Sequence, residues 1–300
     1  MADCFGNARV LIIAGSDSGG GAGIQADLKT VMALGGYAST AITALTAQNT
    51  CRVTDVHPVP PAFIRAQIET VLNDIGADCI KTGMLHDSAV IETVAATLEQ
   101  HAPTVPKVID PVMVAQSGDR LIAEAAIEQL RSVLLPQATL LTPNLPEAEV
   151  LLGEPITTPG AMAEAAVALR ALGPEAVLLK GGHAVATTPA KDPGDGGTTE
   201  ESRDGDPDRH HDDVVIDILA TSAGVESFRQ LRLSTTSNHG TGCTLASAIA
   251  TGLAQGLTMP QAVARARAYL HEALQRATGL GRGHGPVAHG ITVRPFVPTT

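Results

Sequence analysis

The stretch Asn238-His239-Gly240-Thr241-Gly242-Cys243-Thr244-Leu245-Ala246-Ser247 is a glycine-punctuated turn that runs directly into an apolar helix. Leu245, Ile249 and Leu253 recur at helical spacing, and Gly256 ends the run. Because the two glycines of the turn have no Cβ, several backbone N–H groups can point at one position, where the positive end of the helix dipole reinforces them. The stretch therefore predicts an anion-binding site at the start of a helix.

Cys243 lies in or near the first turn of this helix. At that position the pKa of a thiol is lowered, so we expect a thiolate near neutral pH. A base beside a phosphate-binding turn suggests phosphoryl transfer to an alcohol. A helix start with a buried, inert cysteine explains these ten residues equally well.

The composition is that of a globular α/β chain and argues against nucleic-acid binding. Of the 300 residues 44% are hydrophobic but only 2% are aromatic and none is Trp, so Ala, Val, Leu and Ile must fill the core. Base stacking on aromatic side chains is therefore excluded. The net charge of −11 also argues against binding a polyanion. Nine acidic and three basic residues within Lys191–Asp213 supply −6 of that charge.

The cysteines and the first apolar run indicate a cytoplasmic protein that does not bind membranes. Cys4, Cys51, Cys79 and Cys243 are far apart and form no C-x-x-C pair, so neither a disulfide framework nor a zinc site is predicted. The run Val10–Ala14 is too short for a signal peptide or a membrane span, and no basic segment precedes it. We interpret it as the first buried strand.

Short apolar runs alternate with longer amphipathic runs, which predicts β–α units and a mostly parallel sheet. The expected strands are Val10–Ala14, Ala41–Leu45, Cys79–Lys81, Val108–Ile109, Thr139–Leu141, Ala176–Leu179 and Val214–Leu219. The expected helices are Ile24–Leu34, Pro61–Ile75, Ser88–Gln100, Ala123–Leu134, Ala161–Leu172 and a last one, opened by a capping box at Thr258–Gln261, that runs to about Ala277.

Distinctive polar or glycine-rich clusters follow nearly every predicted strand. They lie at Gly15–Gly23, Thr46–Thr50, Thr82–Leu85, Asp110–Met113, Thr142–Glu147 and Gly181–His183. In open α/β sheets, ligands bind beyond the carboxyl ends of the strands. Six such loops at one edge predict one composite site.

Each cluster also has a simpler explanation. Gly19, Gly21 and Gly23 resemble a dinucleotide fingerprint, but the acidic residue that should follow is missing and no Walker A sequence occurs, so the loop better fits close approach to a small ligand. Glu147, three residues after Asn144, either complements a helix dipole or holds hydrated Mg²⁺ beside phosphates.

Two further side chains are candidates for ligand binding. Lys180 ends an apolar strand and precedes two glycines, a place where a lysine usually meets an anion. Gln48 carries an amide donor and acceptor suited to the edge of a heterocycle, although a loop glutamine is more often simply solvated.

Several segments closely resemble the bacterial hydroxymethylpyrimidine/phosphomethylpyrimidine kinases of thiamin synthesis, which belong to the ribokinase-like superfamily. They are Ala14–Asp17, Gly20–Thr30, Ala47–Thr50, Gly83–Leu85, Thr142–Glu147, Lys180–His183 and His239–Leu245, in the same order and with similar spacing. The resemblance runs from about Val10 to Val287. It implies a single ribokinase-like domain over residues 1–300, with a central, mainly parallel sheet flanked by helices on both faces.

The resemblance also implies roles for individual residues. Gln48 would bind the aminopyrimidine, and Gly15, Asp27, Met84 and Val112 would line the same pocket. Gly240, Thr241 and Gly242 would form the anion hole, with Cys243 as the base. Asn144 and Glu147 match the motif that organises Mg²⁺, and Lys180 lies where the phosphates of ATP are expected.

The implied activity is ATP-dependent phosphorylation of 4-amino-5-hydroxymethyl-2-methylpyrimidine and then of its monophosphate. Pyridoxal kinase is an open alternative, because relatives with the same cysteine turn accept that similar heterocycle. A catalytically silent binding protein is disfavoured, since Cys243, Glu147 and Lys180 are all present. We expect a small-molecule substrate and a homodimer, with no nucleic-acid or membrane partner.

Residues from about 184 to 213 depart from the family pattern, because this segment is longer and more acidic. It has almost no apolar residues before Val214, so we expect it to be disordered. The pair His210-His211 suggests at most weak metal chelation. An inert surface insertion is favoured over a metal-binding segment or a lid.

Overall fold

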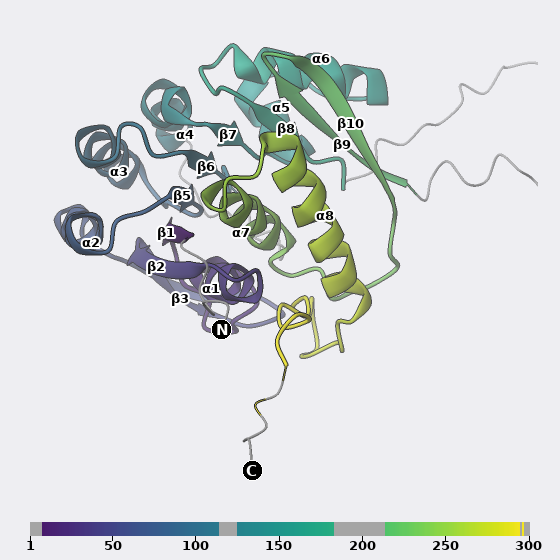
Figure 1. Ribbon diagram of the computed structural model, residues 1–300, viewed down its shortest axis with the longest axis horizontal. Helices are drawn as coiled ribbons and strands as arrows, with labels where there is room; N and C mark the ends of the chain where they lie inside the picture. The colour runs from purple at the N-terminus through teal and green to yellow at the C-terminus, as the bar shows by residue number, and fades with distance from the viewer. Residues whose placement is uncertain (1–7, 114–124, 183–213, 295, 297–300) are drawn as a thin grey trace, which may run out of the picture.

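An eight-stranded sheet forms the centre of the protein, with helices on both of its faces (Figure 1). The computed structural model describes residues 8–113, 125–182, 214–294 and 296. The predicted insertion at 184–213, with His210-His211, lies outside the described residues. The strand order is β10-β9-β8-β7-β6-β5-β1-β2, and every pairing from β2 to β8 is parallel, whereas β9 is antiparallel to both of its neighbours. The expected mainly parallel α/β sheet is confirmed.

The strands lie close to where the apolar runs predicted them. The main sheet contains β1 Arg9–Ala14, β2 Tyr37–Ile42, β5 Cys79–Thr82, β6 Lys107–Ile109, β7 Leu140–Leu141, β8 Val177–Leu179, β9 Val214–Thr221 and β10 Gly224–Leu231. A separate two-stranded sheet contains β3 Ala44–Gln48 and β4 Val53–Pro58. The strand expected at Ala41–Leu45 is therefore wrong as one unit, because the chain leaves β2 at Ile42 and starts the smaller sheet at Ala44. Sequence analysis missed β4 and β10, whose residues are largely exposed and so lack an apolar run.

The helices also match the predicted amphipathic runs. They are α1 Gly23–Ala33, α2 Pro61–Asp74, α3 Ser88–His101, α4 Ala125–Gln129, α5 Leu145–Leu152, α6 Pro159–Arg170, α7 Thr241–Ala254 and α8 Met259–Gln275. A π-helical turn over Leu130–Leu134 and a 3₁₀ turn over Leu135–Gln137 continue α4. The expected start of that helix at Ala123 lies outside the described residues. None of the helices in the described ranges has the length and apolar character needed to cross a membrane.

The sheet separates two hydrophobic cores. Residues 10–14 of β1 are all buried, as required for a strand covered on both faces. One core packs the sheet against α2 to α6, and the other packs it against α1, α7 and α8. Leu11 and Ile13 point into the first core, whereas Val10 and Ile12 point into the second. This alternation fixes which face of the sheet each helix covers.

The direction of the chain changes at β1, and this creates the place for a ligand. From β1 the chain first adds β2 on one side, and then adds β5, β6, β7 and β8 on the other. The loops that follow β1 and β5 therefore diverge at the carboxyl edge, where open sheets bind ligands. Helix α7 packs against β1, β5 and β6, and its N-terminus at Thr241 opens at the same edge.

Candidate active site

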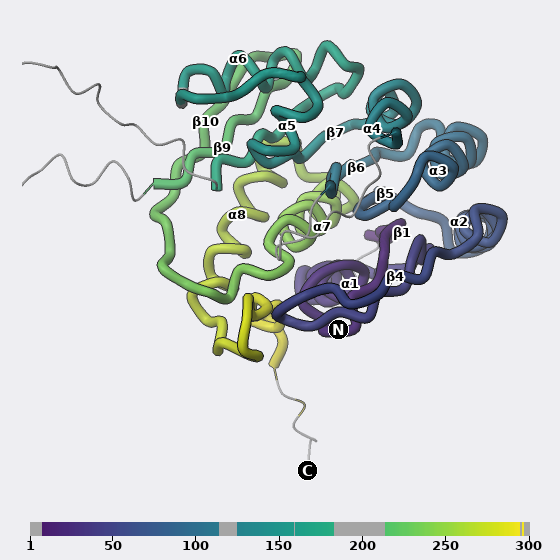
Figure 2. The backbone as a smooth tube through the Cα atoms, turned by 180° about the vertical axis from the view of Figure 1, so that it is seen from behind, coloured from purple at the N-terminus to yellow at the C-terminus, as the bar shows by residue number. Residues whose placement is uncertain are grey.

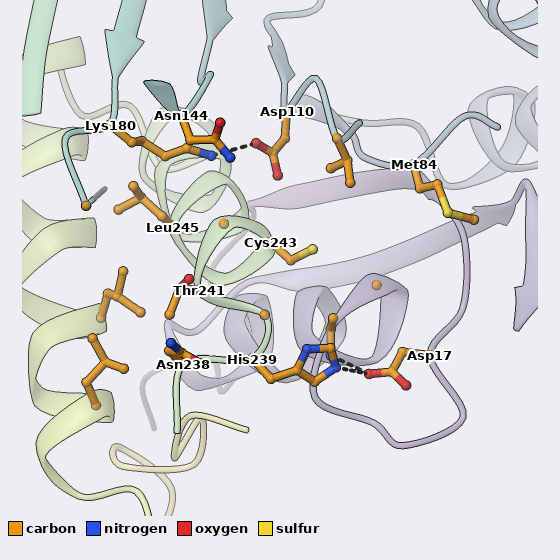
Figure 3. A pocket seen from close by; sticks show the side chains of 18 of the residues that line it. Asp17, Met84, Asp110, Asn144, Lys180, Asn238, His239, Thr241, Cys243 and Leu245 are labelled. Atoms are coloured by element: carbon orange, nitrogen blue, oxygen red, sulfur yellow. Dashed lines mark hydrogen bonds and ion pairs between the residues drawn. The ribbon is translucent and has the colours of Figure 1, made fainter. Parts of the chain in front are cut away.

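A cavity of about 440 Å³ lies over the carboxyl edge of the sheet. Its lining includes most of the predicted site residues, namely Gly15, Gln48, Met84, Val112, Asn144, Glu147, Lys180, Gly240, Thr241, Gly242 and Cys243. Figure 3 shows Lys180, Asn144 and Asp110 at one end, His239 and Asp17 at the other, and Cys243 between them. The fold thus brings together in a single cavity loops that are far apart in sequence, such as those of Gly15 and Gly240.

Asp27 is the predicted site residue that does not line this cavity. Its side chain is fully buried behind the wall, where both carboxylate oxygens accept from Lys81 Nζ at 3.0 Å. Ser247 Oγ donates to the same carboxylate at 2.7 Å. That Asp27 contacts the pyrimidine stays a prediction, and in this structure its carboxylate is bonded to Lys81 and Ser247 instead.

The turn before α7 has the geometry expected of an anion hole. Gly240 has φ +80°, and a Cβ there would collide with the carbonyl oxygen of Gly21 in the loop after β1. Only glycine therefore allows the two loops to approach this closely. Thr241, Gly242 and Cys243 of this first turn line the cavity, and the first N–H groups of a helix have no partner within the helix itself.

Cys243 lies half-buried in the first turn of α7 and lines the cavity. Burial raises the pKa of this thiol to about 11, despite the nearby Lys81 ammonium and a hydrogen bond from the backbone of Gly23, which both lower it. The expected lowering of the thiol pKa is therefore wrong for the chain without ligands. Desolvation outweighs the helix dipole here, and the carboxylates of Asp27 and Asp110 add to it.

Lys180 and Asp110 form an ion pair at the charged end of the cavity. Lys180 Nζ donates to Asp110 Oδ1 at 3.0 Å, and Thr142 Oγ1 donates to the same oxygen at 3.1 Å. Burial lowers the pKa of Lys180, but Asp110 and Glu147 outweigh it, so this pKa is raised and the lysine carries its charge. The sequence analysis places Asp110 only within a loop, although its position directly after a buried strand is a usable signal for a site residue.

Asn144 and Glu147 form a complete capping box at the start of α5. Asn144 Oδ1 accepts from Glu147 N at 2.9 Å, and Glu147 Oε2 accepts from Asn144 N at 2.8 Å. Burial raises the pKa of Glu147 to about 7, with Lys180 opposing the rise and Asp110 adding to it. The capping role and a role toward phosphates are therefore compatible, because both residues also face the cavity.

Asp17 and His239 organise the opposite end of the cavity, and sequence reasoning assigned neither a role. Asp17 accepts from His239 Nε2 at 2.8 Å and from the backbone N–H groups of Gly19, Gly21 and Ala22. Burial raises the pKa of Asp17, but these hydrogen bonds outweigh it and hold the pKa below its usual range. Gln48 Nε2 lies 3.5 Å from His239 Nε2, so the amide predicted to recognise the ring belongs to this end.

One part of the cavity wall is apolar. Val215, Leu233, Leu270 and Leu274 line it. Below them Asp217 accepts from Gly181 N at 2.9 Å and from Arg267 Nε at 2.7 Å. This buried pair fixes the backbone that follows Lys180. Between them, the apolar wall and the charged end suit a nucleotide base and its phosphates.

Known proteins resemble this chain over nearly its whole length. The family described as phosphomethylpyrimidine kinase matches residues 17–288. The hydroxymethylpyrimidine/phosphomethylpyrimidine kinase of Mycobacterium tuberculosis is 46% identical over 280 residues, which cover 93% of each chain. The thiamine biosynthesis bifunctional protein ThiED of Geobacter sulfurreducens is 47% identical over 285 residues, 95% of this chain and 53% of that protein. The chain thus spans about half the length of this bifunctional relative.

A solved structure shares the fold as well. The structure of the pyridoxal kinase from Staphylococcus aureus in complex with AMP-PCP and pyridoxal superposes with a TM-score of 0.78 at 33% identity, covering 94% of this chain and 93% of that one. Because the family match spans residues 17–288 and both sequence relatives align with more than nine-tenths of the chain, the chain belongs to the hydroxymethylpyrimidine/phosphomethylpyrimidine kinase family.

Proposed function

We propose that this chain transfers the γ-phosphoryl group of ATP to 4-amino-5-hydroxymethyl-2-methylpyrimidine and then to the resulting monophosphate, as a step of thiamin biosynthesis. One observation carries the proposal. The anion-binding turn before α7 lies between an end of the cavity with an amide, Gln48, and an end with a charged lysine, Lys180. A ring and a triphosphate bound at these two ends would meet at the turn.

The cavity residues divide the reaction among them. Gln48 would hold the aminopyrimidine by its edge, and the apolar wall would hold the adenine. The hydroxymethyl oxygen attacks the γ-phosphorus, the bond from that phosphorus to the β–γ bridging oxygen breaks, and the hydroxyl proton passes to Cys243 Sγ in its thiolate form. The N–H groups of the turn and Lys180 stabilise the negative charge on the transferring group.

The charged end also suits Mg²⁺. Asp110 and Glu147 present two buried carboxylates to the same region, and the charge of Asp110 contributes to the raised pKa of Glu147. Hard oxygen ligands of this kind, together with phosphates, are what Mg²⁺ prefers. Among the described residues no group of three His, Cys, Asp or Glu side chains could hold a metal unaided. When bound with the nucleotide, the ion would neutralise phosphate charge.

An ADP-release assay with separate substrates tests the proposal. Hydroxymethylpyrimidine, its monophosphate, pyridoxal and hydroxyethylthiazole are offered one at a time with ATP. We expect ADP with the first two compounds. ADP from none of the four would instead identify a silent binding protein.

Replacement of Gln48 tests where the ring binds. Gln48→Ala should weaken pyrimidine binding by about 1–3 kcal/mol with little effect on ATP, because it removes buried hydrogen bonds to the ring. Gln67→Ala is the matched control, since the Gln67 amide bonds only to the backbone of Ile42, at 2.9 and 3.1 Å. Calorimetry that shows ATP weakened and the pyrimidine unaffected would reverse the placement of the two ligands.

Pyridoxal kinase is the second candidate function. It is favoured by the structural similarity to a pyridoxal kinase whose solved complex contains pyridoxal. The ratio of kcat/KM for hydroxymethylpyrimidine to that for pyridoxal decides between the two. A ratio below one would make pyridoxal the preferred substrate.

We also propose one folding domain and a homodimer, which are expected from the resemblance. A single calorimetric unfolding transition and sedimentation at twice the mass of the chain would support both. A stable monomer with full activity would contradict the dimer.

A further inference from the structure

The segment Gly281–Pro286, which follows α8, bonds both to the tip of the β3–β4 hairpin and to the chain that leads into α7. We call this segment the C-terminal strap. Figures 1 and 2 both show it beside the tip of the β3–β4 hairpin and beside the chain that leads into α7. Gly283 is 233 residues from Thr50 at the hairpin tip, and His284 is 46 residues from Asn238 before α7, so only the fold brings these three segments together.

On one side the strap holds the hairpin tip. His284 N donates to the carbonyl oxygen of Thr50 at 2.9 Å, and Gly283 N donates to Thr50 Oγ1 at 3.3 Å. Thr50 is two residues beyond Gln48, which ends β3. The hairpin is not paired with the main sheet, although Ser18 Oγ bonds to the backbone of Gln48 at 2.8 Å. Ser16 also bonds to the strand, through Ala44 and Thr46. The strap therefore adds an anchor at the hairpin tip, beyond the contacts that the loop after β1 makes.

On the other side the strap holds the anion-binding turn. His239 N donates to the carbonyl oxygen of Gly285 at 3.0 Å, and His284 Nδ1 lies 2.8 Å from Asn238 Oδ1. His239 and Pro286 also form an isolated parallel bridge. The same short segment thus bonds to both the turn and the hairpin tip.

The glycines of the strap are required by this close approach. A Cβ at position 283 would collide with the carbonyl oxygen of Thr50, and a Cβ at position 281 would collide with the Thr50 side chain. Because a backbone carbonyl cannot rotate away as a side chain does, the hairpin tip would have to move. Gly290 is different, since a Cβ there meets nothing within 4 Å and its φ is not positive.

We propose that the C-terminal strap is a positioning element that sets the separation between Gln48 and the anion-binding turn, and thereby determines affinity for the pyrimidine but not for the nucleotide. The proposal rests on the proposed function for the identity of the ligands. The charged end comes from the loops after β6, β7 and β8. In the described part of the chain, no hydrogen bond of the strap reaches Asp110, Asn144 or Lys180 there. Nucleotide binding should therefore be insensitive to the strap.

The test compares Gly283→Ala with Gly290→Ala by calorimetry and steady-state kinetics. We expect Gly283→Ala to raise the Kd and KM for hydroxymethylpyrimidine by about tenfold or more, because a displacement of about 1 Å at a binding group has effects of this size. The Kd for AMP-PCP should stay within about twofold, since the strap and the charged end have no hydrogen-bond partner in common in the described part of the chain. Gly290→Ala should behave as the unmodified chain in both measurements.

A second variant covers the case in which Gly283→Ala does not fold, as judged by circular dichroism. His284→Ala removes the contact with Asn238 without adding an atom, and we expect it to weaken the pyrimidine alone, by about threefold to tenfold for one lost hydrogen bond. Equal pyrimidine affinity in the strap variants and Gly290→Ala overturns the strap proposal while leaving the kinase intact. Equal weakening of pyrimidine and AMP-PCP also overturns it. An unmodified chain that neither binds nor phosphorylates the pyrimidine overturns the proposed function and, with it, the strap's assigned role.

Discussion

Two lysine–aspartate ion pairs with the same Nζ–Oδ1 distance, 3.0 Å, lie near Cys243 and have different roles. The pair of Lys81 with Asp27 is fully buried, whereas the side chain of Lys180 is 14% exposed to the cavity. Both Asp27 oxygens bond to Lys81, and Ser247 completes the set. In the second pair, Lys180 and Thr142 both use Asp110 Oδ1, and Asp110 itself lines the cavity.

This difference separates a pair that supports the fold from a pair that can meet a ligand. Burial lowers the pKa of Lys81, but Asp27, Cys243 and Asp110 outweigh it and raise this pKa, so the ammonium is held charged. A buried pair whose hydrogen bonds are all made matters for stability because removing one partner leaves the other as an unpaired buried charge. We call the Lys81–Asp27 pair the closed pair and the Lys180–Asp110 pair the open pair. In the open pair, Lys180 can instead exchange Asp110 for phosphate oxygens as its hydrogen-bond partner.

The largest effect should come from breaking the closed pair. Lys81→Met should lower the free energy of unfolding by about 3–5 kcal/mol, because Asp27 is left as an uncompensated buried charge. Urea denaturation of the variant measures the loss. The double variant Lys81→Met/Asp27→Leu should recover part of it. A loss below about 1 kcal/mol is the size seen for surface salt bridges, and it would contradict the structural role assigned to the Lys81–Asp27 pair.

Breaking the open pair should instead impair catalysis. Lys180→Met should lower kcat by about 10²–10³-fold, the usual cost of losing one donor to the transition-state charge. Its unfolding free energy should fall by less than that of Lys81→Met, because Asp110 keeps Thr142 and access to the cavity. Steady-state kinetics and urea denaturation on the same preparations check both statements. A Lys180 variant that unfolds more readily than Lys81→Met would invert the comparison.

Cys243 lies within electrostatic reach of both lysines, so it sharpens the contrast between them. Cys243→Ala should lower turnover of the hydroxymethyl substrate by at least about a hundredfold with nearly unchanged pyrimidine affinity. The monophosphate should lose less, because a phosphate with a second pKa of about 6 is already deprotonated at neutral pH.

The pH dependence of the rate checks the same residue. Since the thiol pKa is about 11, the thiolate fraction and the rate should rise with pH above neutrality in the unmodified chain. That rise should be absent in Cys243→Ala. The control is Cys79→Ala, because Cys79 is a buried cysteine on β5 that does not line the cavity. A Cys243 variant with more than half of the normal rate would remove this thiol from the mechanism.

The smallest effect concerns Glu147, the acidic neighbour of the open pair. Its folded-state pKa of about 7 lies above the ordinary value of 4.5, so the folded carboxyl binds its proton more tightly than the unfolded one. The resulting stability is complete below pH 4.5 and is lost as the pH rises through about 7. The chain should therefore be more stable at pH 6 than at pH 8 by on the order of 1 kcal/mol from this group. Glu147→Gln should reduce that difference, and denaturation at the two pH values measures it.

The loops of the cavity could be predicted because they follow buried strands. Apolar runs such as Val10–Ala14 identify parallel strands, and the carboxyl ends of parallel strands share an edge. The family expected from the motifs is confirmed, and so is the sheet. The β3–β4 hairpin was not predicted as such, because β4 is mostly exposed and has no apolar pattern to indicate it.

Local pattern thus determined the βα order, the capping box at Thr258–Gln261 that opens α8, and the glycine turn that opens α7, since each depends on residues close in sequence. Only the tertiary structure decided which charges are satisfied and which are available. Asp27 and Asp110 each pair with a lysine that is distant in sequence, 54 residues away for Asp27 and 70 residues away for Asp110. Neither the pairing nor the burial of the two carboxylates can therefore be deduced from the neighbouring residues. The pKa of Cys243 was decided in the same way, because desolvation depends on everything packed around the thiol, whereas the helix dipole depends on α7 alone.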